Sequence, residues 1–172
     1  GDDLDEHNED VDLTLSVTAG AATAAGQTAH ETTITDNDEL PTVTLSITDA
    51  ATLAEDGAAA TADITATLSA ISGRGVTVAL VFDGTALKGT DYTCPDYIII
   101  PKGSKTATIT LTTLEDSLVE GTEGFTIDID TIEYGTEDGE QQVDGAIVDD
   151  EVATVAFVLN TSVPVETDAD FV

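Results

Sequence analysis

Basic residues are nearly missing from this chain. It carries 4 Lys and Arg against 35 Asp and Glu, which gives a formal net charge of -31 over 172 residues. Nucleic acid is excluded as a partner, because phosphate binding needs a basic surface, and an anionic membrane is disfavoured for the same reason. A charge of this size destabilises a compact state by self-repulsion unless salt or bound cations relieve it.

Cysteine and aromatic residues are also scarce. Cys94 is the single cysteine, so no disulfide can form within the chain, and metal binding remains as a substitute stabiliser. Because Cys94 has no histidine near it in the sequence, we expect a packed thiol rather than a nucleophile. Tryptophan is absent and aromatics make up 4% of the residues, so we expect a core built from Val, Ile, Leu and Ala.

Long apolar runs and helical periods are lacking as well. No signal peptide, transmembrane run or lipidation motif is visible, and no window of ten or more residues has a helical period. Apolar residues instead alternate with Thr and other polar residues, which is typical of half-buried strands. Together with an apolar content of 41%, this alternation argues for folding rather than for the disorder common in very acidic chains. The predicted strands cover residues 43–47, 62–68, 76–82, 97–100, 107–111, 125–129 and 143–148.

Seven short strands separated by turn residues predict an all-β fold, an antiparallel immunoglobulin-like β-sandwich. Turn signals such as Glu55-Asp56-Gly57, Asp83-Gly84 and Pro101-Lys102-Gly103 lie between the strands. The Cys…Trp…Cys signature of immunoglobulin domains is absent, so the sandwich belongs to a class that is stabilised in another way.

The chain repeats itself. Residues 2–15 align with residues 116–129, 114 positions later, as an acidic loop followed by an alternating strand. Further matches place the repeat length at about 111 residues, which fits an array of independently folding domains rather than a solenoid. We expect residues 1–40 to be the C-terminal part of a preceding repeat, residues 41–151 a complete domain, and residues 152–172 the first strand of a following repeat or a strand donated to another chain.

The complete copy resembles a Calx-beta domain. The match rests on Ala54-Glu55-Asp56-Gly57, Gly89-Thr90-Asp91-Tyr92, the acidic loop from Leu114 to Phe125, and the closing run from Ile147 to Glu151. This resemblance implies a β-sandwich that binds Ca²⁺ at one tip. It also implies a ligand set: Glu55, Asp83, Glu115, Asp116, Glu120, Glu123, Asp149, Asp150 and Glu151 in the complete copy, Asp2, Glu6, Glu9, Asp36 and Asp38 in the first partial copy, and Glu166 in the last.

Elementary chemistry agrees with a calcium site. Ca²⁺ takes six to eight oxygen ligands, largely carboxylate and carbonyl. Carboxylates from distant segments repel one another at one tip unless a cation lies among them. Mg²⁺ is less apt because it keeps several waters in a tight octahedron, and Zn²⁺ needs a His or Cys cluster. Asp91 is a further candidate ligand, but we expect its side chain to order its own turn by hydrogen bonds to the backbone.

Departures from the family pattern bear on the site. Ser117 stands where the resemblance implies a third acid, and Glu115 and Glu151 stand where it implies Asp. Fewer or longer carboxylates reduce the number of ions or the affinity. The alternative to a metal site is a solvated acidic rim, in which the carboxylates are hydrated and bind no ion.

Three functional hypotheses remain open. The first is a calcium-binding structural module of a large extracellular surface protein, an adhesin or filament, in which Ca²⁺ stiffens domain tips and junctions. The second is a filament subunit whose incomplete ends complete sandwiches in identical chains. The third is a calcium-sensing regulatory domain. No catalytic constellation is present, so we expect no enzyme.

Overall fold

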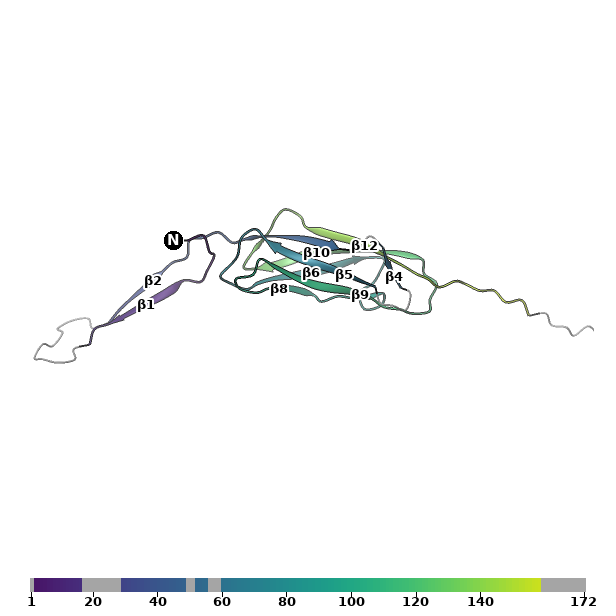
Figure 1. Cartoon of the computed structure of the whole chain (residues 1–172), viewed down its shortest axis with the longest axis horizontal. Coiled ribbons are helices and arrows are strands. Elements are labelled where there is room, and N and C mark those ends of the chain that lie inside the picture. Colours follow the sequence, from purple (N-terminus) through teal and green to yellow (C-terminus); the bar gives the residue numbers. More distant parts are fainter. Residues whose placement is uncertain (1, 17–28, 49–51, 56–59, 159–172) are drawn as a thin grey trace, which may run out of the picture.

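The computed structural model describes residues 2–16, 29–48, 52–55 and 60–158. Its centre is a sandwich of two five-stranded sheets, with a separate two-stranded hairpin at one end of the long axis and the segment 152–158 leaving from the other end (Figure 1). The prediction of an all-β sandwich is confirmed. Among the described residues, no helix is long and apolar enough to cross a membrane.

The seven predicted strands are all present, and the structure adds short edge strands. One sheet consists of β4 (Leu53–Ala54), β12 (Gln142–Val148), β10 (Thr122–Glu133), β6 (Val76–Gly84) and β8 (Tyr97–Ile100), in that order. The other consists of β11 (Thr136–Glu137), β3 (Thr42–Thr48), β5 (Thr61–Leu68), β9 (Thr106–Thr113) and β7 (Tyr92–Thr93). The sequence pattern missed β4, β7 and β11, because two residues are too few to show an alternation.

The core follows from this alternation. Most inward positions of β5, β6 and β9 are aliphatic, and Ile64, Val78 and Leu111 among them are fully buried. The expected aliphatic core is correct for most positions, but the two largest fully buried side chains are aromatic. Tyr92 and Phe125 lie with ring centroids 5.6 Å apart, so the few aromatic residues are concentrated where they bury the most apolar area.

Cys94 is a packed thiol. Its side chain is buried next to the core. Burial raises the pKa of this thiol to about 11, so it stays protonated at neutral pH and is a poor nucleophile.

Two strands of the first sheet approach closely at a glycine pair. Gly84 ends β6 with φ +128°, a region that other residues rarely adopt. A Cβ atom at Gly84 would lie 2.2 Å from the backbone oxygen of Gly124. The amides of Thr85 and Ala86 donate to that same oxygen. Glycine at position 84 therefore lets β6 stay paired with β10 up to its last residue.

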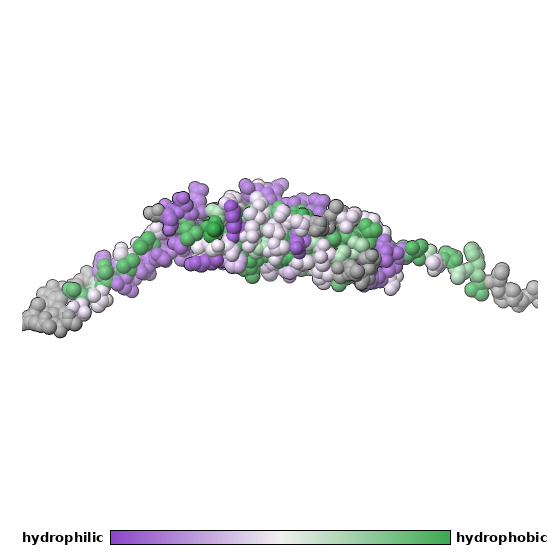
Figure 2. All heavy atoms as spheres, in the orientation of Figure 1, coloured by the Kyte–Doolittle hydropathy of each residue, from purple (hydrophilic) through white to green (hydrophobic). Residues whose placement is uncertain are grey.

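The hairpin has the same strand pairing as β10 and β12. It consists of β1 (Glu9–Thr14) and β2 (Ala29–Ile34), antiparallel, with Glu9 opposite Ile34. In the sandwich, Glu123 lies opposite Ile147. The equivalent positions are thus paired in the same register. The hairpin's apolar residues remain exposed, with Leu13 at 60% and Leu15 at 63%, and Figure 2 shows green patches along it.

Candidate calcium-binding site

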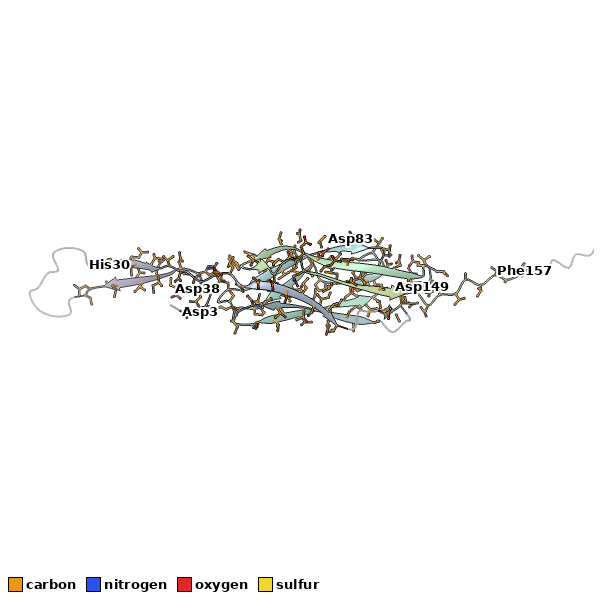
Figure 3. The ribbon with its side chains drawn as sticks, turned by 90° about the horizontal axis from the view of Figure 1, so that it is seen from above. Asp3, His30, Asp38, Asp83, Asp149 and Phe157 are labelled. Atoms are coloured by element: carbon orange, nitrogen blue, oxygen red, sulfur yellow. The ribbon has the colours of Figure 1, made fainter. Side chains whose placement is uncertain are left out.

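The acidic loop between β9 and β10 carries most of the candidate ligands. Asp116 orders the loop, because its Oδ1 accepts the amide of Leu118 at 2.6 Å. Gly121 turns the chain at φ +91° just before β10 begins. Asp149 lies at this end of the sandwich (Figure 3) and accepts hydrogen bonds from two amides of the loop.

Asp149 fastens the loop to the end of β12. Its Oδ2 accepts the amides of Glu120 at 2.8 Å and Gly121 at 2.9 Å, and its Oδ1 accepts the amide of Glu151 at 3.2 Å. These hydrogen bonds, with the Gly121 amide contributing most, lower the pKa of Asp149 to about 2. Asp149 is therefore ionised throughout the physiological range.

Glu55 reaches the same tip from a third direction. It follows β4, which runs parallel to β12, and its amide donates to the carbonyl of Val148 at 3.0 Å. Its side chain is 6% exposed. Oxygens of Glu55, Asp116 and Glu120 lie within 4.8 Å of one another. Burial, followed by the charges of Asp116 and Glu120, raises the pKa of Glu55.

Two further groups of carboxylates adjoin this one. Each has its ligand oxygens within 4.8 Å of one another. The first joins Asp91, Glu120 and Glu123, and the second joins Glu115, Asp150 and Glu151. Because Glu120 belongs to two of the three groups, neighbouring ions could share its carboxylate.

The carboxylates in this region lie close to other carboxylates. No ion pair joins Glu55, Asp116 or Glu120 to a lysine or arginine in the part of the chain that the structure describes. Desolvation and neighbouring carboxylates raise the pKa of Glu120 and of Glu123. A hydrogen bond with Asp149, together with desolvation, raises the pKa of Glu151 to about 7. The pKa values of four glutamates at the tip are thus raised, because desolvation and neighbouring acidic groups disfavour their ionised forms.

Asp83 and Asp91 differ in their positions relative to the carboxylate groups. Asp83 lies exposed near the end of β6, in none of the three carboxylate groups, and its Oδ1 accepts the amide of Gly84. Asp91 is 4% exposed and lies against Glu120 and Glu123. It also orders its own turn as expected, since its Oδ2 accepts the amide of Leu87 at 2.5 Å. The two functions are compatible because a carboxylate has two oxygens.

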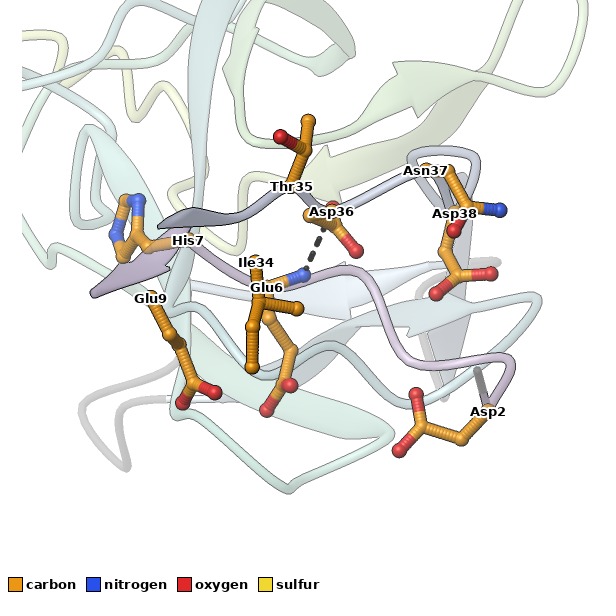
Figure 4. A pocket seen from close by; sticks show the side chains of 9 residues that line it. All are labelled: Asp2, Glu6, His7, Glu9, Ile34, Thr35, Asp36, Asn37 and Asp38. Carbon is orange, nitrogen blue, oxygen red and sulfur yellow. Dashed lines mark hydrogen bonds between the residues drawn. The ribbon is translucent and has the colours of Figure 1, made fainter. Parts of the chain in front are cut away.

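The five predicted ligands of the first partial copy gather around a hollow in the surface. Asp2, Glu6, Glu9, Asp36 and Asp38 all line it, at the base of the hairpin (Figure 4). The amide of Glu6 donates to Oδ2 of Asp36 at 3.2 Å. This hydrogen bond repeats the one from Glu120 to Asp149. Desolvation, with Asp36 as the next cause, raises the pKa of Asp38. Glu166 lies outside the described residues.

Arg74 connects this hollow to the sandwich. Its guanidinium lies 3.1 Å from Oδ1 of Asp5 and 3.5 Å from Oδ2 of Asp36, and it donates to the carbonyl of Glu6. It also stacks on Tyr134, 5.3 Å from the ring centroid. One cation therefore neutralises part of the acidity at the hairpin, and Asp36 contributes to the joint as well as to the candidate site.

The turn before Arg74 completes this joint. The amide of Gly73 donates to the carbonyl of Asp5 at 2.8 Å, and the hydroxyl of Ser72 donates to Oδ2 of Asp5 at 2.9 Å. Asp5 is 3% exposed as a result. The contacts of Asp5, Ser72 and Arg74 were not predicted from the sequence. A signal existed at Asp5, since the repeat places Val119 at the equivalent position, and a change from apolar to charged points to a new contact.

Comparison with known proteins identifies the family. The Calx-beta domain model matches residues 36–160. This chain belongs to the Calx-beta domain family. Calx-beta domains are calcium-binding modules and not a catalytic family. A search of curated proteins found no match.

Solved structures agree with this Calx-beta fold. The chain is similar to the apo form of the Calx CBD1 domain, with a TM-score of 0.50 and 18% identity over 64% of this chain and 99% of that one. It is also similar to the calcium-binding domain CBD12 of CALX1.1, with a TM-score of 0.50 and 19% identity over 62% of this chain and 44% of that one. At these identities the likeness supports the fold alone.

Proposed function

We propose that the chain binds Ca²⁺ at the tip of its Calx-beta sandwich and serves as a structural module in a tandem array of such domains. The observation that carries the proposal is the convergence of Glu55 with Asp116 and Glu120 of the β9–β10 loop to within 4.8 Å, with no ion pair to a lysine or arginine among the described residues. Belonging to a calcium-binding family adds to it.

The donor set fits Ca²⁺ best. All members of the three groups are carboxylates, and no His or Cys belongs to them. Hard oxygen donors in large number suit Ca²⁺, whose coordination is flexible, better than Mg²⁺ or Zn²⁺. The ligands we propose for the complete copy are Glu55, Asp91, Glu115, Asp116, Glu120, Glu123, Asp150 and Glu151, with Asp149 holding the loop in place.

Two observations support a tandem array. β1 and β2 pair in the same register as β10 and β12, and the Asp36–Glu6 hydrogen bond repeats the Asp149–Glu120 one. The carboxylates around the hairpin hollow would then form an incomplete copy of the tip site, whose equivalents of Glu55 and Asp91 belong to a preceding domain. We further propose an extracellular or cell-surface location, where millimolar Ca²⁺ suits structural rather than sensory sites.

Calorimetric titration of the chain with Ca²⁺ tests the proposal. We expect more than one ion per chain, with dissociation constants near 10⁻⁴–10⁻³ M as in other extracellular calcium modules. Mg²⁺ at the same concentration should give a much smaller heat. Constants near or below the micromolar range would favour the sensor instead, and the absence of heat with Ca²⁺ would leave the tip as a solvated acidic rim.

A second candidate function has its own support. The apolar residues of the hairpin are exposed, and so are Val155 at 81% and Phe157 at 93%. Exposed strands and extended apolar segments are suited to pairing with other chains. If the chain is a filament subunit, it will form oligomers that grow with protein concentration. Monomers at every concentration in Ca²⁺ would reject this alternative.

A further inference from the structure

The loop at the calcium tip exposes an apolar pair. Leu118 is 58% exposed and Val119 is 57% exposed, in a loop that otherwise carries carboxylates. Two adjacent branched side chains exposed by one loop form a small apolar surface that a partner could cover. The copy of this loop near the N-terminus shows what kind of partner could cover them.

The two loops are equivalent residue by residue. Glu6 and Glu120 donate the same hydrogen bond to the aspartate that follows the last strand, and the strands that leave the loops pair in the same register. Leu4 and Asp5 therefore correspond to Leu118 and Val119. In the first loop this pair is covered: Leu4 is half-buried, and Asp5 is 3% exposed against the turn of Ser72 and Arg74.

We propose that Leu118 and Val119 dock on the turn of a following sandwich that is equivalent to residues 71–75, and that this second joint is apolar where the first is ionic. The proposal rests on the tandem arrangement proposed above. In the first joint Arg74 pairs with two carboxylates, those of Asp5 and Asp36. In the second joint Val119 replaces Asp5, so an arginine on the partner turn would have only Asp149 to pair with. We expect an apolar side chain in place of Arg74 on the partner turn.

The path of the chain agrees with a following sandwich as the partner. Residues 152–158 leave the sandwich from this tip (Figure 1). Their exposed Val155 and Phe157 match Val43 and Leu45 of β3 in the repeat, of which Val43 is fully buried. A second copy of this chain fits less well, because its own turn at Ser72 is already covered by its Asp5.

A concatemer tests the proposal. Residues 1–151 are fused to a second copy of residues 39–172, which keeps the spacing of the first joint between Asp149 and the second β3. Spin labels on the two sandwiches report the distribution of distances between them. The fused chain places Val119 opposite Arg74, a mismatched pair, and we expect a broad distribution. Val119→Asp in the first sandwich restores an ionic joint, and Arg74→Leu in the second restores an apolar one.

Each of these single changes should give a narrow distribution, and both together should return it to broad. Val81→Asp, which changes an exposed apolar residue on β6, serves as the control and should have no effect. Equal distributions in all variants would overturn the proposal. The distances are recorded in Ca²⁺ and in chelator, so that a failure of calcium binding is distinguished from a failure of docking.

Discussion

At the scale of single residues, the tip combines two kinds of carboxylate. Asp149 is held ionised by three backbone amides and fixes the loop, whereas the pKa values of Glu55 and Glu120 are both raised by desolvation and by the nearby charge of Asp116. A bound cation would stabilise the ionised forms of Glu55 and Glu120, because coordination to the metal would replace the repulsion between neighbouring carboxylates. This division predicts which substitutions weaken metal binding and which weaken the loop.

Glu55→Gln should weaken calcium binding by about tenfold or more, since a buried charged ligand is lost while the shape is kept. Calorimetric titration measures the change. Asp83→Asn is the matched control, because Asp83 was expected from the sequence to be a ligand but lies in none of the carboxylate groups. Equal losses in the two variants would show that bulk charge, and not the Glu55 site, determines the affinity.

The pH dependence of stability should change when calcium is removed. The pKa of Glu151 is raised to about 7 in the folded chain. Its contribution to stability is therefore full below its ordinary pKa of about 4.5 and is lost as the pH rises through about 7. Asp149, with its pKa lowered to about 2, contributes a constant amount above pH 4.

Without calcium, the melting temperature should thus fall between pH 5 and pH 8. With saturating calcium the fall should be much smaller, because the ion takes the place of the protons. Thermal unfolding followed by circular dichroism at several pH values measures both slopes. Glu151→Gln should flatten the slope in chelator, and an unchanged slope in this variant would contradict the role given to Glu151.

At the scale of elements, the sheets depend on close approaches that only glycine permits. Gly84→Ala should destabilise the sandwich by about 2–3 kcal/mol, because it adds strain at φ +128° and a contact with the Gly124 oxygen. Gly89→Ala is the control, with φ +90° and no atom within 4 Å of an added Cβ. Strain alone predicts a smaller loss there, of about 1–2 kcal/mol. Denaturant unfolding measures the free energy of unfolding of both variants. Equal losses would mean that the contact with the Gly124 oxygen does not contribute to the effect.

The sequence predicted elements better than it predicted contacts between them. Strands such as β5 and β9 follow from alternation along the chain, because burial on one face is a local pattern. The acidic loop and Asp149 were found because they occur in a repeat. Asp91 was set aside because a turn function explained it, and its burial beside Glu123 depends on how β7 meets β10. Arg74 was missed because a joint between distant segments leaves no periodic signal.

At the scale of the whole molecule, the chain enters at one end of an elongated sandwich and leaves at the other (Figures 1 and 3). The hairpin and the turn at Arg74 lie at the entry, and the candidate calcium tip lies at the exit. In a tandem array, each acidic tip would therefore face the turn of the next domain that is equivalent to residues 71–75. The angle between neighbouring domains is fixed only if both the acidic loops and the joint between the domains are ordered.

The first joint should depend on Arg74. Arg74→Gln leaves Asp5 buried beside a neutral partner, which should cost about 2 kcal/mol or more of docking free energy. Amide hydrogen exchange at Gly73, whose amide donates to Asp5, should then become faster. Lys88→Gln, which removes an ion pair with the exposed Asp96 elsewhere on the sandwich, is the control. Unchanged protection of Gly73 in Arg74→Gln would show that packing alone holds the hairpin.

Thermal unfolding of the chain in Ca²⁺ and in chelator tests the central claim most directly. An ion at one hundred times its dissociation constant stabilises the fold by about 2.7 kcal/mol per site, which corresponds to a rise of about 10 °C or more for a domain of this size. We predict a rise of that order with Ca²⁺, and a clearly smaller rise with the same concentration of Mg²⁺. Identical melting temperatures in Ca²⁺ and in chelator would contradict the assignment of the tip carboxylates as a calcium site.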